Sequence, residues 1–252
     1  MTVTGVPVFL GKHVRAIHFG ETERIFVALD FGRSDRNGFP EQSPSRYLAK
    51  RGIGTLSIML SENSWYLTPE NDALRHALDA HCRGARDVRA MGVSMGGFGA
   101  VLLSKALHLK KALLISPQYS IFRSRAPWDR RRNRISAKFS EAWDDLDQGV
   151  KPDLSGMMIY DPRRRPDVHH IRALGRVLPD MKIAAVPFGG HPAHVNLVGR
   201  SGFRLLIDLL HNDGSMTTWL NDYRRKEREN NAVYLRGMTD YLDLREQRKL
   251  RE

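Results

Sequence analysis

The sequence predicts an α/β protein: a mostly parallel sheet with helices on both faces, a helical insertion and a helical C-terminal extension. Three observations predict this fold class. Short runs rich in Val, Ile, Leu and Phe alternate with helix-like patterns, as in sheets whose parallel strands are joined by helices. Hydrophobic residues make up 41% of the 252 residues, which is ordinary for a folded protein. The chain has no internal repeat and no low-complexity linker, so a single domain over residues 1–252 is the simplest organisation.

The apolar runs define the expected elements in order. The expected strands are Val14–Phe19, Ile25–Phe31, Thr55–Leu60, Val88–Val93, Ala112–Ile115, Met157–Tyr160 and Ile183–Phe188. The expected helices are Pro69–His81, Phe98–Leu107, Val168–Leu178 and Phe203–Leu210. The first two strands are separated only by Gly20-Glu21-Thr22, which predicts a hairpin or another tight connection.

Two regions depart from this alternation. Residues 119–155, here called the insertion, have no strand pattern and contain Arg-rich and acidic helical patches. Residues 216–252 are helical by pattern and heavily charged, with basic and acidic residues nearly balanced. We therefore expect an insertion that covers one edge of the sheet as a lid, and a C-terminal helical extension.

Charge and cysteine content limit the class of protein. The formal net charge is +12, and Cys82 is the only cysteine, so no disulfide within the chain and no cysteine-based metal site is possible. The N-terminus lacks the pattern of a secretory signal, and apolar runs such as Ile25–Leu29 are too short to span a bilayer. We expect a cytoplasmic location with no membrane span.

A G-x-S-x-G motif lies at Gly92-Val93-Ser94-Met95-Gly96. It falls between an expected strand and an expected helix, where a sharp turn needs glycines on both sides so that a serine hydroxyl can project. Without further support, a glycine-rich turn with no chemistry would explain the motif equally well. Ser94 is the candidate nucleophile.

The order of residues along the chain supplies the support. A serine nucleophile needs a base, and the base needs an acid that orients it. Asp161 follows the strand Met157–Tyr160, and His191 follows Gly189-Gly190 after the next strand. Both would lie at the carboxyl edge of the sheet, where open α/β sheets build ligand sites. We therefore predict Asp161 as the acid and His191 as the base.

Each assignment has competitors. His194 is the alternative base, although it is expected to open the next helix, and His169 and His170 are expected to pack or to face solvent. Asp167 is the second candidate for the acid, with charge at a helix N-terminus as its ordinary explanation. Asp30, near the end of an early strand, is the third.

On these residues the chain resembles a small bacterial α/β-hydrolase over roughly residues 14–210. The segment 92–97 resembles the nucleophile elbow, and Asp161 and His191 match the acid and the histidine after the late strands. Ser116-Pro117-Gln118 also resembles a stretch of hydrolases from bacterial surface-polysaccharide gene clusters. The resemblance implies a serine esterase with a triad and no cofactor.

An oxyanion hole in this plan uses two backbone N–H groups. One belongs to Met95, directly after the serine. The other comes from the loop after an early strand, where Phe31 or Gly32 is the candidate and Gly32 is preferred. No histidine pattern or phosphate-binding loop indicates a metal or a cofactor.

Half of the net charge lies in residues 123–138, here called the basic segment. Its cations are Arg123, Arg125, Arg130, Arg131, Arg132, Arg134 and Lys138. Trp128 is its only aromatic side chain suited to stacking, and no nucleic-acid-binding motif accompanies it, so nucleic acid is not the favoured partner. The segment either attracts anionic substrates to the site or is a solvated, salt-bridged surface.

The function expected from these features is hydrolysis of a carboxylic ester, either an acyl or an acetyl ester, with a small-molecule, saccharide or anionic substrate. Two alternatives share the fold. The first is an acyltransferase with the same triad. The second is a non-catalytic protein that binds a partner through the basic segment.

Overall fold

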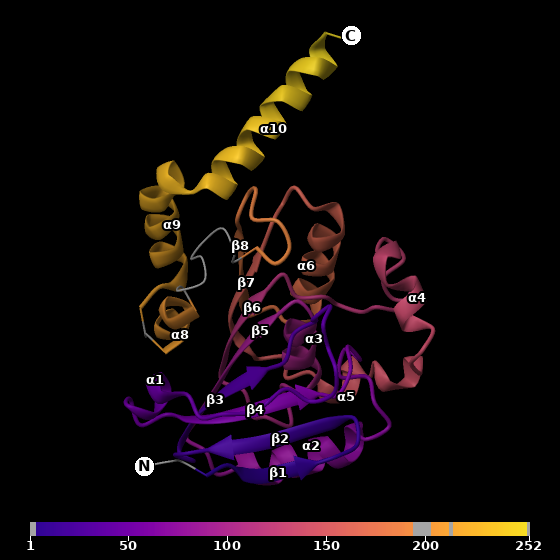
Figure 1. The fold of residues 1–252 in the computed structure, drawn as a ribbon, viewed down its shortest axis with the longest axis vertical. Helices are drawn as coiled ribbons and strands as arrows, with labels where there is room; N and C mark the ends of the chain where they lie inside the picture. The colour runs from indigo at the N-terminus through magenta and orange to yellow at the C-terminus, as the bar shows by residue number, and fades with distance from the viewer. Residues whose placement is uncertain (1–3, 194–202, 212–213, 251–252) are drawn as a thin grey trace.

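The computed structural model describes residues 4–193, 203–211 and 214–250 (Figure 1). Its strands are β1 (Val6–Leu10), β2 (Val14–Phe19), β3 (Arg24–Leu29), β4 (Gly54–Leu60), β5 (Asp87–Val93), β6 (Lys111–Ile115), β7 (Ser155–Tyr160) and β8 (Met181–Ala185). Its longer helices are α2 (Asn71–Cys82), α3 (Met95–Leu102), α6 (Arg165–Val177), α8 (Phe203–His211), α9 (Met216–Glu227) and α10 (Ala232–Lys249). Short helical turns are α1 (Arg46–Ala49), η1 (Arg130–Arg132), α4 (Asn133–Ser136), η2 (Glu141–Trp143), α5 (Leu146–Gly149) and η4 (Arg228–Asn230).

The strands form one eight-stranded sheet in the order β1-β2-β4-β3-β5-β6-β7-β8. Strands β3 to β8 pair in parallel, and only the β1–β2 and β2–β4 pairs are antiparallel. The predicted mostly parallel sheet is therefore confirmed.

Two details at the start of the chain differ from the prediction. β2 and β3 do not form a hairpin, because β4 lies between them and pairs with both. Gly20, with φ +85°, turns the chain out of β2. The chain then passes Gly54, the first residue of β4, before it enters β3. β1 was not expected: it is an edge strand, it contains Pro7, and its register shifts between Pro7 and Phe9.

Side chains of the central strands alternate between two apolar cores, as the period of a strand requires. On β6, Leu114 belongs to the core under α2, α3 and α6, whereas Leu113 and Ile115 belong to the core under α1, α8 and α9. Figure 1 shows α8 and α9 on one side of the sheet and α3 and α6 on the other. The predicted helices on both faces are confirmed.

The insertion consists of short helical turns between β6 and β7. Asp129, a buried carboxylate, bonds to His170 of α6, and the side-chain amide of Asn71 in α2 donates to the carbonyl of Trp143. A second buried carboxylate, Asp144, accepts a hydrogen bond from Ser120 within the insertion. The insertion is thus fastened to the body of the protein by polar contacts as well as by its apolar side chains.

The C-terminal extension contains α9 and α10. Met216 and Leu220 of α9 are buried in the second core. α10 packs Tyr234 and Tyr241 on Phe188, and beyond them it projects from the body of the molecule (Figure 1). It exposes Val233, Leu242 and Leu244. Among the described residues, no helix is both long and apolar enough to cross a membrane.

The buried carboxylate of Asp144 makes stability depend on pH. Burial is the main cause that raises its pKa to about 6, and Glu141 adds to it, while Ser120 and Arg125 oppose the shift. Between about pH 4 and pH 6 the folded chain therefore binds more protons than the unfolded chain, so its stability falls as pH rises through this window.

We expect Asp144→Asn to remove this pH dependence. The free energy of unfolding of the wild type, relative to Asp144→Asn, should fall by about 2 kcal/mol between pH 4 and pH 7. Urea unfolding at both pH values measures it. Asp147→Asn, at an exposed position of the same segment, is the control for loss of one negative charge. Parallel pH profiles for wild type and Asp144→Asn would show that the carboxyl titrates normally in the fold.

Candidate active site

Ser94 lies on the sharp turn between β5 and α3. Its backbone has φ 51° and ψ −109°, a conformation that non-glycine residues rarely adopt. Its N–H still donates to the carbonyl of Ile115 on β6, at 2.8 Å, so the turn is held against the sheet. The strain is typical of a residue whose side chain must project from the end of a strand.

The glycines of the motif make room for this turn. A Cβ atom at position 92 would lie 2.4 Å from the carbonyl oxygen of Gly96, and one at position 96 would lie 2.8 Å from the carbonyl oxygen of Asp30. Both contacts are with backbone atoms, which cannot move without distorting the turn or the neighbouring loop. The structure therefore explains why the serine has glycine two residues before it and two residues after it.

Ser94 and His191 come together although 97 positions separate them in the sequence. The hydroxyl oxygen of Ser94 lies 2.8 Å from Nε2 of His191. Nδ1 of the same imidazole lies 2.9 Å from a carboxylate oxygen of Asp167, in the first turn of α6. Because an ionised carboxylate only accepts hydrogen bonds, Nδ1 carries the proton and Nε2 is free to accept one from Ser94.

The Asp167 carboxylate is buried, with 2% of the residue exposed. Burial alone would raise its pKa, but the hydrogen bond and charge of His191, together with Arg131, lower the pKa below its usual value. Nη2 of Arg131 donates to its second oxygen at 3.1 Å. Asp167 therefore stays ionised at neutral pH, in the form that can hold His191.

Asp161, the predicted acid, does not face His191. It lies directly after β7 as expected, but its two oxygens accept the backbone N–H groups of Arg163 and Gly190, each at 2.8 Å. It thus fastens the loop that carries His191. The residue that meets the imidazole is Asp167, the second candidate, because the first turn of α6 points its side chain back over the sheet edge.

A second buried histidine connects the insertion to this region. His170 accepts the N–H of Tyr119 at Nδ1, at 3.1 Å, so its proton is on Nε2 and is donated to Asp129 at 2.9 Å. Arg131 bonds to both Asp129 and Asp167. One network of hydrogen bonds therefore joins the insertion to the carboxylate behind His191.

Asp30 and His169, two of the remaining candidates from the sequence, make contacts with residues other than Ser94 and His191. Asp30 is buried and accepts a two-point ion pair from Arg36, at 2.7 and 2.9 Å. His169 is exposed and packs on Trp128. His194 lies outside the described residues.

The loop after β3 is rigidly held beside Ser94. The N–H of Phe31 donates to the Asp30 carboxylate at 2.9 Å, which leaves Gly32 as the candidate donor toward Ser94. Asn63 accepts the N–H of Arg33 at 3.1 Å and donates to its carbonyl at 2.6 Å. Gly32 and Met95 both line the cavity at Ser94, and the N–H of Met95, in the first helical turn, has no acceptor within α3.

The cavity at Ser94 has a volume of about 520 Å³. Its lining includes His191, the indole of Trp65, and Arg132 and Ile135 from the basic segment. Nε1 of Trp65 donates to Gln118 at 2.7 Å, which fixes the indole as one wall. The insertion therefore contributes two side chains directly to the space above the serine.

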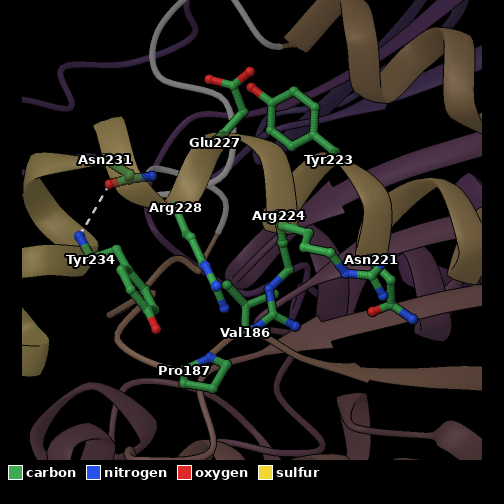
Figure 2. A pocket seen from close by; sticks show the side chains of 10 residues that line it. Val186, Pro187, Asn221, Tyr223, Arg224, Glu227, Arg228, Asn231 and Tyr234 are labelled. Atoms are coloured by element: carbon green, nitrogen blue, oxygen red, sulfur yellow. Dashed lines mark hydrogen bonds between the residues drawn. The ribbon is translucent and has the colours of Figure 1, made fainter.

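A smaller cavity of about 230 Å³ lies between the end of β8 and the C-terminal extension. Figure 2 shows Arg224 and Arg228 directed from α9 and η4 toward Val186 and Pro187. Arg224 donates to the carbonyl of Ala185 at 2.6 Å, so the extension braces the segment that leads to His191. Among the described residues, no group of three or more His, Cys, Asp or Glu side chains could hold a metal ion.

Sequence reasoning missed several residues that shape this site. Arg36, Asn63 and Trp65 carry no motif, and their roles depend on contacts across the fold. Ser116-Pro117-Gln118, which the sequence analysis singled out, contacts the residues that surround Ser94 and His191. The Ser116 hydroxyl accepts the N–H of Ala193 at 3.0 Å, and Pro117 lies against Gly97.

Comparisons with known proteins give the fold a name. No protein-family model and no curated protein matches the chain. Among solved structures, the capsule O-acetyltransferase of Neisseria meningitidis serogroup A is similar with a TM-score of 0.52 and 14% identity, over 83% of this chain and 95% of that one. A mutant of that enzyme in complex with CoA is similar with a TM-score of 0.50 and 12% identity, over 71% and 85%.

An α/β serine hydrolase without a lid from Xanthomonas campestris is similar with a TM-score of 0.46 and 16% identity, over 90% of this chain and 95% of that one. With its mostly parallel eight-stranded sheet and its likeness to the capsule O-acetyltransferase structures, the chain has the α/β-hydrolase fold. At these identities, the likeness concerns the fold.

Proposed function

We propose that the protein is a serine hydrolase that cleaves a carboxylic ester through an acyl-enzyme on Ser94. The observation that carries the proposal is the unbroken line of hydrogen bonds from Ser94 through His191 to Asp167. A serine at the end of a strand, on a strained turn and facing an open cavity, has the exposure that attack on a carbonyl carbon needs.

The geometry supports the following steps. His191 takes the proton of the Ser94 hydroxyl on Nε2 as the serine oxygen bonds to the acyl carbon. Asp167 holds Nδ1–H and stabilises the imidazolium that forms. The imidazolium then gives the proton to the departing alcohol oxygen. In the second half, water attacks the acyl carbon of the acyl-enzyme while His191 takes its proton on Nε2. The imidazolium then gives this proton to the oxygen of Ser94, and the carboxylic acid is released.

The negative oxygen of the tetrahedral intermediate needs donors that are already in place. The N–H groups of Met95 and Gly32 are our candidates, since both residues line the cavity at Ser94. The ion pair of Asp30 with Arg36 and the two hydrogen bonds from Asn63 keep the Gly32 loop in position before substrate arrives.

A fluorophosphonate probe tests the proposal directly. We expect one covalent adduct per chain, located on Ser94 by peptide mass spectrometry, and no adduct after prior unfolding in urea. Absence of any adduct on the folded protein would favour the non-catalytic alternative, in which the basic segment binds a partner.

A transferase that passes the acyl group to an alcohol is the second candidate, because it would use the same acyl-enzyme. The capsule O-acetyltransferase with a similar fold is named for such a transfer. Product analysis with p-nitrophenyl acetate and a competing alcohol separates the two. A hydrolase yields acetate, whereas a transferase yields the acetate ester of that alcohol, in a ratio of ester to acetate that exceeds the ratio of alcohol to water in the assay.

A further inference from the structure

The cavity at Ser94 has an imbalance of charge. Arg33 and Arg132 both line it, and no Asp or Glu is among its described lining residues. Cations at a partly closed site, with apolar walls such as Trp65 and Ile135, are less screened than cations in open water. The space next to the serine therefore favours an anion.

Arg132 is the better placed of the two cations. Its guanidinium lies over the ring of Trp65, at 4.7 Å from the centroid. Within the described part of the chain its Nε atom is buried without a hydrogen-bond partner, and no carboxylate forms an ion pair with it. Burial is the main cause that lowers the pKa of Arg132, followed by the charge of Arg131. Its Nε–H donor is thus desolvated and unused.

Its neighbour Arg131 shows the contrast. The side chain of Arg131 donates to both oxygens of Asp129, each at 2.8 Å, and also to Asp167. Arg131 therefore serves the fold, and its turn η1 directs the next arginine into the cavity. Arg131 thus binds carboxylates of the protein itself, whereas the adjacent Arg132 is available to bind a ligand.

Arg33, in the loop after β3, supplies a second positive charge to the lining of the cavity. Its backbone is held by Asn63, and its Nε lies 3.9 Å from Asp30. Asp30 is already neutralised by the two short bonds from Arg36, so the charge of Arg33 is left over. Nε of Arg33 is likewise buried without a hydrogen-bond partner in the described structure.

We propose that the substrate ester carries an anionic group, such as a carboxylate or a phosphate, which binds between Arg132 and Arg33 while the ester carbonyl lies at Ser94. This inference rests on the proposed esterase function and narrows its substrate class. A guanidinium donates two parallel hydrogen bonds to such a group, which fixes the orientation of the substrate as well as its affinity.

Two pairs of esters that differ only in charge test the proposal. In 4-acetoxybenzoate and 4-acetoxybenzamide the anion or the neutral amide is on the alcohol side of the ester. In monophenyl adipate and its amide it is on the acyl side. In at least one pair we expect kcat/KM of the anionic ester to exceed that of the neutral ester by about 10- to 100-fold.

Variants then assign the preference to a residue. Arg132→Gln should reduce the ratio of anionic to neutral kcat/KM to near one. Arg130→Gln removes the same charge from an exposed position in the same turn and should keep the ratio. Arg33→Gln should reduce the ratio by a smaller factor, because the side chain of Arg33 is 38% exposed and its charge is screened by solvent.

The outcomes separate this inference from the proposed function. Equal kcat/KM for anionic and neutral esters in both pairs, with Ser94 labelled by the fluorophosphonate, overturns the inference and leaves the esterase in place. An equal loss of preference in Arg130→Gln and Arg132→Gln also overturns it, since the effect would then be one of net charge. No labelling and no turnover of any of the four esters overturns both.

Discussion

A Ser94→Ala variant should lose about 10⁴-fold or more of kcat on p-nitrophenyl acetate. The hydroxyl oxygen is the only atom removed, and it is the atom that lies 2.8 Å from Nε2 of His191. The methyl group of alanine fits the same strained turn. The loss therefore reports the missing nucleophile and leaves the fold unchanged.

The measurement needs two controls. Ser43→Ala, at an exposed serine in a loop, should keep wild-type kcat. The melting temperature of Ser94→Ala should be equal to or above that of the wild type, because residues on strained active-site turns are seldom optimal for stability. Wild-type turnover by folded Ser94→Ala would mean that another residue attacks the ester.

The fold could be predicted from sequence because its inner strands are buried on both faces. The run at 112–115 is continuously apolar and the run at 88–93 is interrupted only by Arg89, as expected for strands of a covered parallel sheet, and each is followed by a helix or a loop at the expected place. β1 escaped prediction, because Val6, Pro7 and Leu10 are exposed and the strand, at the edge of the sheet, has no periodic pattern of apolar residues.

The order of the strands in space was also beyond the sequence at one point. The short connection at 20–22 suggested a hairpin, since neighbouring antiparallel strands need only a few residues between them. The pairing of β4 with both β2 and β3 decides otherwise. A local turn signal does not reveal which distant strand will supply the hydrogen bonds.

The site was partly predictable for a similar reason. Ser94 and His191 each follow a strand directly, so their positions at the sheet edge depend on local sequence. The acid does not: Asp161 and Asp167 are separated by one turn of loop, and both reach the same edge. Which of them meets His191 depends on the direction of α6 and on the backbone N–H groups that occupy Asp161.

The contacts of the insertion were the least predictable part. The pairing of Arg131 with Asp129 and Asp167 requires the insertion to fold back onto α6, and no spacing in the sequence encodes that return. The same holds for Arg132 over Trp65, which brings together the segments that follow β6 and β4. Charge composition left an anionic ligand and a solvated, salt-bridged surface as alternatives, and the residues that we propose as the anion site are brought together only by the fold.

A matched pair of variants decides between the two carboxylates. Asp167→Asn should lower kcat by about 10³- to 10⁴-fold, because an amide can donate to Nδ1 of His191 and so place the proton on Nε2, where it blocks acceptance from Ser94. Asp161→Asn should lower kcat by less than about tenfold, because the amide oxygen still accepts one of the two backbone N–H groups.

Asp161→Asn is expected to change the stability of the protein more than its catalysis. Asp161→Asn weakens the anchor of the Gly190 loop and should reduce the free energy of unfolding by about 1–2 kcal/mol, as loss of a charge-assisted hydrogen bond does. Kinetics on p-nitrophenyl acetate and urea unfolding of both variants measure the two effects. If Asp161→Asn lost as much kcat as Asp167→Asn while remaining folded, the acid would be Asp161 and His191 would have to turn toward it during the reaction. The hydrogen bond of 2.9 Å from His191 to Asp167 favours the first result.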